Sequence, residues 1–226
     1  MLYIGLVLGV FAGNIAAHAA GMDAARVYVA TVILMVPALA GARLLYVAAE
    51  WNFYRRHLRR IWDRSDGGYI MYGGLPAALL ISIPLLRVLH VSIAGFWDIA
   101  IFTILVGMFF TRIGCLLHGC CGGRAWNGCF SLRLPDRNGI WEHRVPTQLL
   151  EAAWAAALVV IGVSLRSSMP FRGALFLVLS FGYSVGRLLM EFARDRQPKA
   201  GFSVAHWVTV LILLLSSSAL ALYWPR

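Results

Sequence analysis

Long apolar runs, separated by short polar segments, dominate the pattern of hydrophobic and polar positions. Each run is near the roughly 20 residues that a helix needs to cross about 30 Å of hydrocarbon. The pattern predicts seven membrane-spanning helices, at about 2–20, 27–48, 69–90, 93–118, 147–165, 172–192 and 203–223. Seven spans use about 140 of the 226 residues, so we expect one integral membrane domain over residues 1–226.

Composition supports this interpretation. Hydrophobic residues make up 60% of the chain and charged residues 13%, whereas soluble domains are roughly 45–50% apolar and about 25% charged. The expected fold class is an all-α membrane protein, a seven-transmembrane-helix bundle. No lysine or arginine precedes the first apolar run, so we interpret residues 2–20 as a retained helix rather than a signal peptide.

Two polar segments have their own character. The segment 49–68 is too charged to span, but its aromatic and aliphatic residues have the spacing of one helix face, so we predict an interfacial amphipathic helix. A solvated basic loop is the alternative. The segment 119–146 is rich in glycine, and we expect it to be a polar loop over a lipid-facing cavity of the bundle.

Charged groups inside the predicted spans are the first candidates for chemistry. An ionisable side chain costs at least about 2.5–3.5 kcal/mol in a spanning helix, so each one is a functional candidate. Three predicted helices place such groups at one level of the membrane. The expected phosphate-binding site consists of Arg112, Arg187 and Arg194, oriented by Glu151 and Glu191. The alternative is an intrahelical Arg187–Glu191 pair, with the other arginines reaching for lipid headgroups.

The net charge of +10 comes almost entirely from arginine, since Lys199 is the only lysine among 20 basic residues. All four cysteines, Cys115, Cys120, Cys121 and Cys129, fall in one short segment. Their C-x₄-C-C-x₇-C spacing differs from the paired C-x₂₋₄-C knuckles of structural zinc sites. A metal site, a disulfide or redox pair, and small packed residues in a tight turn all remain open. We assign no metal and no cofactor.

Several short motifs occur in a specific order and spacing. TRIGCLLHGCCGGR at 111–124 is similar to G-R-x-G-N-F-x-N-G-E-x-x-G-R, and DGGYIMYGGL at 66–75 to D-G-G-x-x-x-H-G-G-L. GARLLYV at 41–47 is similar to G-x-R-x-x-Y-V, and PTQLLEA at 146–152 to H-P-[ST]-Q-L-Y-E. Residues 182–194 follow G-Y-x-x-x-R-x-x-x-E-F-x-R. Together they resemble the prolipoprotein diacylglyceryl transferase family.

The resemblance implies a multi-pass enzyme of the bacterial inner membrane. Members of the family move the diacylglyceryl group of phosphatidylglycerol to the lipobox cysteine thiol of a preprolipoprotein, and glycerol phosphate leaves. The expected partners are therefore phosphatidylglycerol or another anionic phospholipid, a preprolipoprotein lipobox segment and the membrane, with no nucleic acid.

The resemblance also implies site residues. The expected catalytic residues are Arg112, Arg187, Glu151, His118 and Tyr72. The expected substrate-binding residues are Arg43, Gly73, Gly74, Gly114, Gly123, Arg124, Gln148, Glu191 and Arg194.

The chain departs from the family pattern at positions that matter for chemistry. Tyr72 stands where the family has a histidine, and a phenol with a pKa near 10 is a much weaker base at neutral pH. Cys115 and Cys120 replace an asparagine and a glutamate. The remaining candidates for proton acceptor are His118, His143 and Glu151.

Two other functions stay open. One is a repurposed family member that binds lipid without transfer, with its cysteines in a redox or metal role. The other is a small-molecule transporter, but the chain lacks the paired discontinuous helices of an internal repeat.

The sequence gives two conflicting indications of sidedness. Counted by the positive-inside rule, the arginines place the signature segment in the cytoplasm, whereas the resemblance places it toward the periplasm. Arginines of the expected site, such as Arg124 and Arg144, inflate the count. We therefore adopt the side that the resemblance implies.

Overall fold

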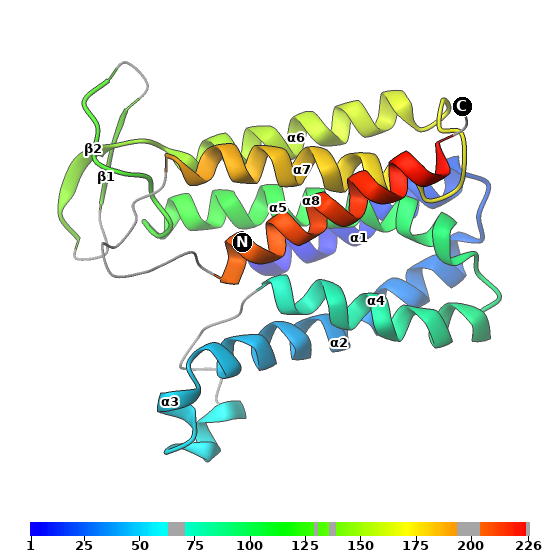
Figure 1. Ribbon diagram of the computed structural model, residues 1–226, viewed down its shortest axis with the longest axis horizontal. Coiled ribbons are helices and arrows are strands. Elements are labelled where there is room, and N and C mark those ends of the chain that lie inside the picture. Colours follow the sequence, from blue (N-terminus) through cyan, green and yellow to red (C-terminus); the bar gives the residue numbers. More distant parts are fainter. Residues whose placement is uncertain (63–70, 129–130, 136–138, 194–203, 225–226) are drawn as a thin grey trace. The chain divides into compact units, whose positions relative to one another are not determined.

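The computed structural model describes residues 1–62, 71–128, 131–135, 139–193 and 204–224, without the side chains of residues 2, 62, 71, 72, 204 and 205. This part of the chain is all-α apart from one hairpin (Figure 1). Its α-helices are α1 (Leu2–Ala19), α2 (Ala24–Ala49), α3 (Trp51–Tyr54), α4 (Met71–Val88), α5 (Ile93–Leu117), α6 (Thr147–Leu165), α7 (Ala174–Glu191) and α8 (Val204–Tyr223).

The helices support the expected membrane class. In the described ranges, five helices are long and apolar enough to cross a membrane, namely α2, α5, α6, α7 and the 206–223 part of α8. Large apolar side chains also lie on the outside, such as Val36 at 70% and Val7 at 68% exposure. A lipid-facing surface explains why so much apolar area remains uncovered by protein. The coarse prediction of an all-α membrane protein is confirmed.

The chain forms two compact units. One contains residues 22–93, and the other contains residues 1–21 together with 94–226. In the smaller unit, α2 packs closely on α4 through small residues. A Cβ added to Gly74 would lie 2.7 Å from the carbonyl oxygen of Ala38, so the two backbones touch where glycine permits it.

The 49–68 segment differs from the predicted single amphipathic helix. Its described part consists of the four-residue helix α3 and the 3₁₀ helix η1 (Leu58–Trp62), with a break between them. Tyr54 is only 2% exposed and packs edge-on against Tyr46. This aromatic residue therefore packs in the protein interior rather than against a membrane surface. Residues 63–68 lie outside the described residues.

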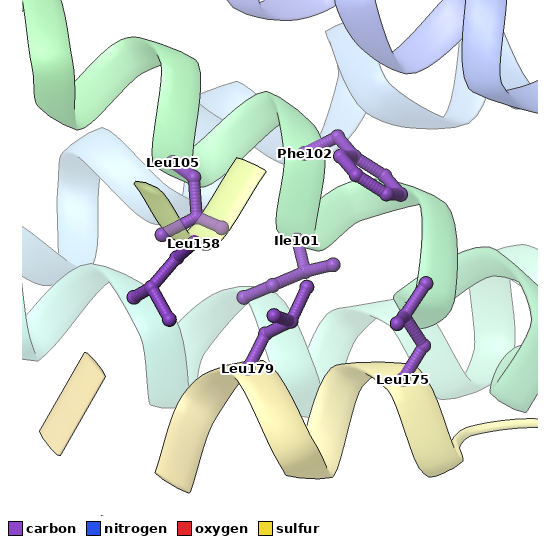
Figure 2. Packing of buried hydrophobic residues seen from close by; sticks show 6 residues of the cluster. All are labelled: Ile101, Phe102, Leu105, Leu158, Leu175 and Leu179. Carbon is purple, nitrogen blue, oxygen red and sulfur yellow. The ribbon is translucent and has the colours of Figure 1, made fainter. Parts of the chain in front are cut away.

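The larger unit has an apolar core between α5, α6 and α7. Figure 2 shows leucine, isoleucine and phenylalanine side chains from these helices meeting one another. The core cluster consists of Ile101, Phe102, Leu105, Leu158, Leu175 and Leu179. Helix α7 also packs against α8. This core fixes the three helices on which the charged residues of the expected site lie.

Helix α1 joins this unit through a stripe of glycines facing α5. A Cβ at Gly9 would lie 2.7 Å from the carbonyl oxygen of Thr103, and one at Gly5 would lie 3.0 Å from that of Gly107. Such close approach of helix backbones is a common packing mode in membranes.

At one end of α5, a half-buried carboxylate caps a neighbouring helix. Asp98 accepts hydrogen bonds from the backbone N–H groups of Gly173, at 2.6 Å, and Phe176, at 2.9 Å. These N–H groups belong to the start of α7 and have no intrahelical partner. Asp98 therefore has a structural role in joining α5 to α7.

The polar segment 119–146, predicted as a loop, contains a two-stranded antiparallel hairpin. Strand β1 (Leu132–Pro135) pairs with β2 (Trp141–Arg144), with Leu132 opposite Arg144. The strands are short and mix charged, apolar and proline residues, so no alternating pattern in the sequence predicts them. In Figure 1 the hairpin lies at one end of α6, which follows β2 directly.

Candidate functional site

Two arginines and two glutamates from α5, α6 and α7 form one buried ion-pair network. Glu151 on α6 lies between two arginines, with its Oε2 2.5 Å from Arg112 Nε and its Oε1 3.8 Å from Arg187 Nη1. Arg187 Nη1 also donates a 2.8 Å hydrogen bond to Glu191 Oε2. The Arg112–Glu151 contact is an ion pair without hydrogen-bond alignment. The network thus joins the charged groups that the sequence places on three helices.

Burial makes this network costly to disrupt. The side chains of Glu151 and Arg187 are 4% and 6% exposed, and that of Arg112 is 14% exposed. Removing one partner of a buried ion pair typically costs about 3–5 kcal/mol, because the other charge is left uncompensated. Because Arg187 contacts Glu151 on α6 as well as Glu191 on its own helix, it forms an interhelical contact in addition to the intrahelical pair. Arg112, the more exposed arginine, lies at the accessible edge of the network.

The start of α6 holds the turn that follows α5. Thr147 Oγ1 donates to the carbonyl oxygen of Cys121 at 3.0 Å, and Gln148 Nε2 donates to that of Cys120 at 2.7 Å. Gln148 is 2% exposed, and within the described ranges its Oε1 has no hydrogen-bond partner. Glu151 lies one helical turn further along the same face of α6. The turn and the ion-pair network are therefore anchored by the same helix.

The turn itself, residues 115–121, is here called the cysteine turn. The N–H of Cys120 donates to the carbonyl of Cys115, and the N–H of Gly119 donates to that of Leu116. With Gly119 in the left-handed region at φ 69°, this is the pattern of a Schellman motif. Cys121 also has a positive φ, of 62°. The motif closes the helix so that residues five apart face each other.

Three sulfur atoms meet in the cysteine turn. The Sγ atoms of Cys115, Cys120 and Cys121 all lie within 4.8 Å of one another, and no described disulfide includes any of the three. Partial burial, and then the neighbouring Cys121 thiol, raise the pKa of Cys120 above its ordinary value. His118 is exposed and is not part of this group of described residues. Cys129 lies outside the described residues.

The end of the signature segment is fixed by backbone contacts. The N–H of Arg124 donates to the carbonyl of Ala193 at 3.0 Å, and its carbonyl accepts from the N–H of Val145 at 3.1 Å. A Cβ at Gly123 would lie 2.6 Å from the carbonyl oxygen of Val145, so only glycine fits there. The side chain of Arg124 is exposed. Gly123 thus has a packing explanation, and its role in substrate binding remains a prediction.

Other predicted site residues are placed apart from this network. Arg43 belongs to the smaller unit, where it donates to the carbonyl oxygens of Arg60, at 3.1 Å, and Ile61, at 3.0 Å. Gly73 and Gly74 form the α2–α4 contact in that unit. Gly114 lies on α5 against the side chain of Met1. The substrate-binding roles of these four residues remain predictions.

Two predicted residues are not described in the structure. Arg194 lies outside the described residues, as does the side chain of Tyr72. Conversely, Tyr183 and Thr147 were absent from the predicted site. Tyr183 lies in the electrostatic neighbourhood of Arg112, with its buried hydroxyl on the α7 segment that carries Arg187. Its position four residues before Arg187 was the signal in the sequence that could have identified it.

Apolar helices that bury paired arginines and glutamates beside a turn of thiols are typical of a membrane protein whose charged groups are candidates for function. The sequence model described as prolipoprotein diacylglyceryl transferase matches residues 1–223. This chain belongs to that family, and the predicted resemblance is confirmed.

Relatives from three Bacillus species show the same relationship, and each carries the name phosphatidylglycerol–prolipoprotein diacylglyceryl transferase. The Bacillus licheniformis protein is 30% identical over 204 residues, covering 86% of this chain and 76% of the relative. The Bacillus velezensis protein is 31% identical over 202 residues, covering 84% and 74%. The Bacillus cytotoxicus protein is 30% identical over 200 residues, covering 84% and 73%. The family is thus one of transferases.

Proposed function

We propose that this chain transfers the diacylglyceryl group of phosphatidylglycerol to the lipobox cysteine thiol of a prolipoprotein. The observation that carries the proposal is the buried network of Arg112, Glu151, Arg187 and Glu191, found in a chain of this family. A substrate thiolate attacks the glycerol carbon that bears the phosphate ester. The carbon–oxygen bond breaks, and glycerol phosphate leaves.

The two arginines supply electrostatic stabilisation of the leaving phosphate. Arginine presents a planar fork of donors that matches phosphate oxygens, and its charge is strongly effective in a site that excludes water. Arg112, at the accessible edge, is placed to contact the phosphate first. Arg187 adds a second positive charge, held in position by Glu151 and Glu191. Removing one such donor group costs about 100- to 1,000-fold in rate in well-studied enzymes.

The free amide oxygen of Gln148 gives the site a neutral acceptor. Its Oε1 is buried beside the cysteine turn, and its Nε2 is already used by the carbonyl of Cys120. A buried acceptor without a partner costs roughly 1–3 kcal/mol, which a ligand hydroxyl can recover. The glycerol headgroup of phosphatidylglycerol carries such hydroxyls. Gln148 is therefore proposed to orient the headgroup.

The finer membrane arrangement is part of the proposal. It includes seven spans formed by α1, α2, α4, α5, α6, α7 and α8, with the 49–68 segment at the interface, in a single multi-pass domain over residues 1–226 of the bacterial inner membrane. Helices α1 and α4 support this arrangement because their described stretches, Tyr3–Ala19 and Gly73–Val88, are apolar and lack only length. We take the signature segment to face the periplasm.

A direct assay tests the transfer. The purified full chain in detergent is mixed with phosphatidylglycerol vesicles and a lipobox peptide, and the peptide mass is followed. The expected product is the diacylglyceryl peptide, and a peptide with serine in place of the cysteine gives none. Arg166→Ala is a matched control for site variants, since Arg166 is exposed at the far end of α6 from Glu151.

A second candidate function is supported by one observation. Cys115 and Cys120 stand at two positions where the resemblance implies asparagine and glutamate, and both belong to the cysteine turn. A member of the family that binds lipid without transfer would bind phosphatidylglycerol in an Arg112-dependent way and yet give no peptide product. That pair of results would contradict the proposed transfer and favour this alternative.

A further inference from the structure

Among the residues that the structure describes in the larger unit, the cysteine turn is a cluster that the ion-pair network does not explain. Three thiols converge there from a spacing that, in sequence, does not match structural zinc knuckles. The fold removes that objection. In a Schellman motif, the residue two positions after the helix C-cap donates its N–H to the carbonyl of the residue five positions earlier in the chain. Here those residues are Cys120 and Cys115, so C-x₄-C is the spacing that this turn brings together.

The third sulfur arrives through an unusual backbone. Cys121 is one of two described non-glycine residues with a positive φ, and this conformation costs roughly 1–2 kcal/mol for an ordinary residue. Thr147 holds the carbonyl of Cys121 and Gln148 holds that of Cys120. Helix α6 thus fixes Cys120 and Cys121, the two residues that complete the sulfur group. A strained residue maintained by its surroundings is a sign of function.

The distances fit a metal ion. Zinc–sulfur bonds of about 2.3 Å place the sulfurs of a tetrahedral site about 3.8 Å apart. The three sulfurs already lie within 4.8 Å of one another, so closure requires shifts of about 1 Å. The exposed position of Cys121, beside the half-buried Cys115 and Cys120, leaves one side of the group open. Three protein ligands with an open fourth position are the pattern of catalytic zinc.

We propose that Cys115, Cys120 and Cys121 bind one zinc ion, whose fourth coordination position takes the thiol of the substrate as a thiolate. The second half of this statement rests on the proposed function. It answers the question of the proton acceptor, because Glu151 is held by two arginines and His118 is not part of the sulfur group of described residues. A thiol that coordinates zinc is deprotonated outright, so no strong base is needed.

The substrate thiol coordinates zinc and its proton passes to water, leaving a zinc-bound thiolate. The sulfur electron pair then forms the bond to the glycerol carbon, while the electrons of the breaking carbon–oxygen bond go to the phosphate oxygen. Glycerol phosphate leaves as an anion, and the thioether product, a weak ligand, dissociates from zinc. Zinc keeps its charge and its three protein ligands throughout.

The position of the cysteine turn suits this step. Cys115 lies three residues after Arg112 on α5, so the two side chains share a helix face. One helical turn is about 5.4 Å. With an attack distance of about 3–3.5 Å, a sulfur nucleophile lies about 5–6 Å from the phosphorus of its leaving group. The zinc-bound sulfur and a phosphate on Arg112 therefore have a compatible separation. Arg112 also offsets the negative charge of a zinc–trithiolate centre.

The metal is tested first on the full chain, purified in detergent under reducing conditions with zinc supplied and then removed from solution. Elemental analysis is expected to find about one zinc per chain. Less than a tenth of an equivalent, or copper in its place, overturns the proposal. Each of Cys115→Ser, Cys120→Ser and Cys121→Ser is expected to lower the bound zinc at least tenfold. Asn127→Ala, an exposed change in the same segment, is the matched control.

Cobalt substitution keeps the test independent of the variants folding. Cobalt bound to thiolates gives a sulfur-to-metal charge-transfer band whose intensity rises with the number of thiolates. The wild-type protein is expected to show the band of three thiolates, and a lipobox peptide is expected to raise it by about a third as a fourth thiolate binds. The serine peptide is expected to leave it unchanged. A wild-type protein without the band, or with a fully paired disulfide under these conditions, overturns the site.

Peptide diacylation is measured on the same zinc-loaded sample, which separates the two proposals. Transfer without any effect of the peptide on the cobalt band, or transfer unchanged after zinc removal, overturns the zinc role and leaves the proposed function standing. A peptide-dependent band without transfer overturns the proposed function and supports the metal site. The absence of both the spectral change and transfer overturns both.

Discussion

Arg43 and Arg187 are equally buried arginines in apolar helices, at 7% and 6% exposure, yet their surroundings differ in kind. Arg43 donates to two backbone carbonyls of η1 and lies over the rings of Tyr46 and Tyr54, at 5.6 and 5.5 Å from their centres. Arg187 faces the carboxylates of Glu151 and Glu191 instead. The contacts of Arg43 with described residues include backbone carbonyls and aromatic rings, whereas those of Arg187 include two carboxylates.

This difference shows what identifies a site among nineteen arginines. Neutral carbonyls and aromatic faces satisfy a guanidinium as a structural anchor, and they fix the segment that supplies them. Carboxylates form a network in which an anion of the substrate can share or replace a partner. The kind of partner, rather than burial alone, therefore separates an anchoring arginine from a candidate functional one.

The largest effect is expected from Arg187→Ala. It removes one positive charge from the phosphate site and leaves two carboxylates without it, so we expect peptide diacylation to fall about 100- to 1,000-fold. Arg187→Lys keeps the positive charge but not the planar fork of donors, so its rate of diacylation should lie between those of the wild type and Arg187→Ala. Initial rates with phosphatidylglycerol vesicles measure this, with Arg166→Ala as the control. A loss of less than tenfold in Arg187→Ala would remove this residue from the site.

Glu151→Gln is expected to have the next largest effect. It should disturb the position of the two arginines rather than the binding of phosphatidylglycerol. The amide keeps the size of the side chain but no longer holds Arg112 and Arg187 by charge. We expect kcat to fall about 100-fold, as when catalytic groups are displaced by about 1 Å, with KM for phosphatidylglycerol changed less than about threefold. A fall in kcat that is accompanied by a corresponding loss of thermal stability would instead indicate a purely structural role.

The helices and the ion-pair network could be predicted from the sequence because both follow from local rules. Long apolar runs bound the helices, and the i, i+4 spacing of Arg187 and Glu191 places them on one face. Charges on three helices converged because each is too costly to leave alone in an apolar bundle. What the sequence did not show was that Glu151 lies between the two arginines, since this depends on how α5, α6 and α7 pack.

The parts that were missed depend on backbone geometry. The hairpin at β1 and β2 forms in a segment where no alternating pattern marks a strand. The convergence of Cys115 and Cys120 depends on Gly119 adopting a left-handed conformation, which turns an unfamiliar spacing into a close contact. Glycine at that position was visible in the sequence, so a Schellman motif was a signal that could have been used. The positive φ of Cys121 had no signal in the sequence.

Arg43→Ala tests the structural side of the comparison. It removes two hydrogen bonds to η1 and two cation–π contacts, so we expect the apparent free energy of unfolding in detergent to fall by about 3 kcal/mol. The 51–62 segment should also be cleaved faster by trypsin at its arginines. Arg26→Ala is the matched control in the same unit, because its pair with Asp23 is half exposed and worth about 0–1 kcal/mol. Unchanged cleavage of 51–62 would show that Arg43 is not its anchor.

Asp98→Ala is expected to have the smallest effect and extends the comparison to a carboxylate with neutral partners. Asp98 resembles Arg43 in being satisfied by backbone groups, here the N–H groups of Gly173 and Phe176. Loss of a helix cap costs about 0.5–2 kcal/mol, so we expect a decrease of about 1–2 kcal/mol in stability. Hydrogen exchange should become faster at the start of α7, and Asp98→Asn, which keeps one acceptor, should lose about half as much. If exchange instead increased around Glu151, on α6 beside the other end of α5, then Asp98 would act through the ion-pair network. The separation between anchoring and functional charges would then fail.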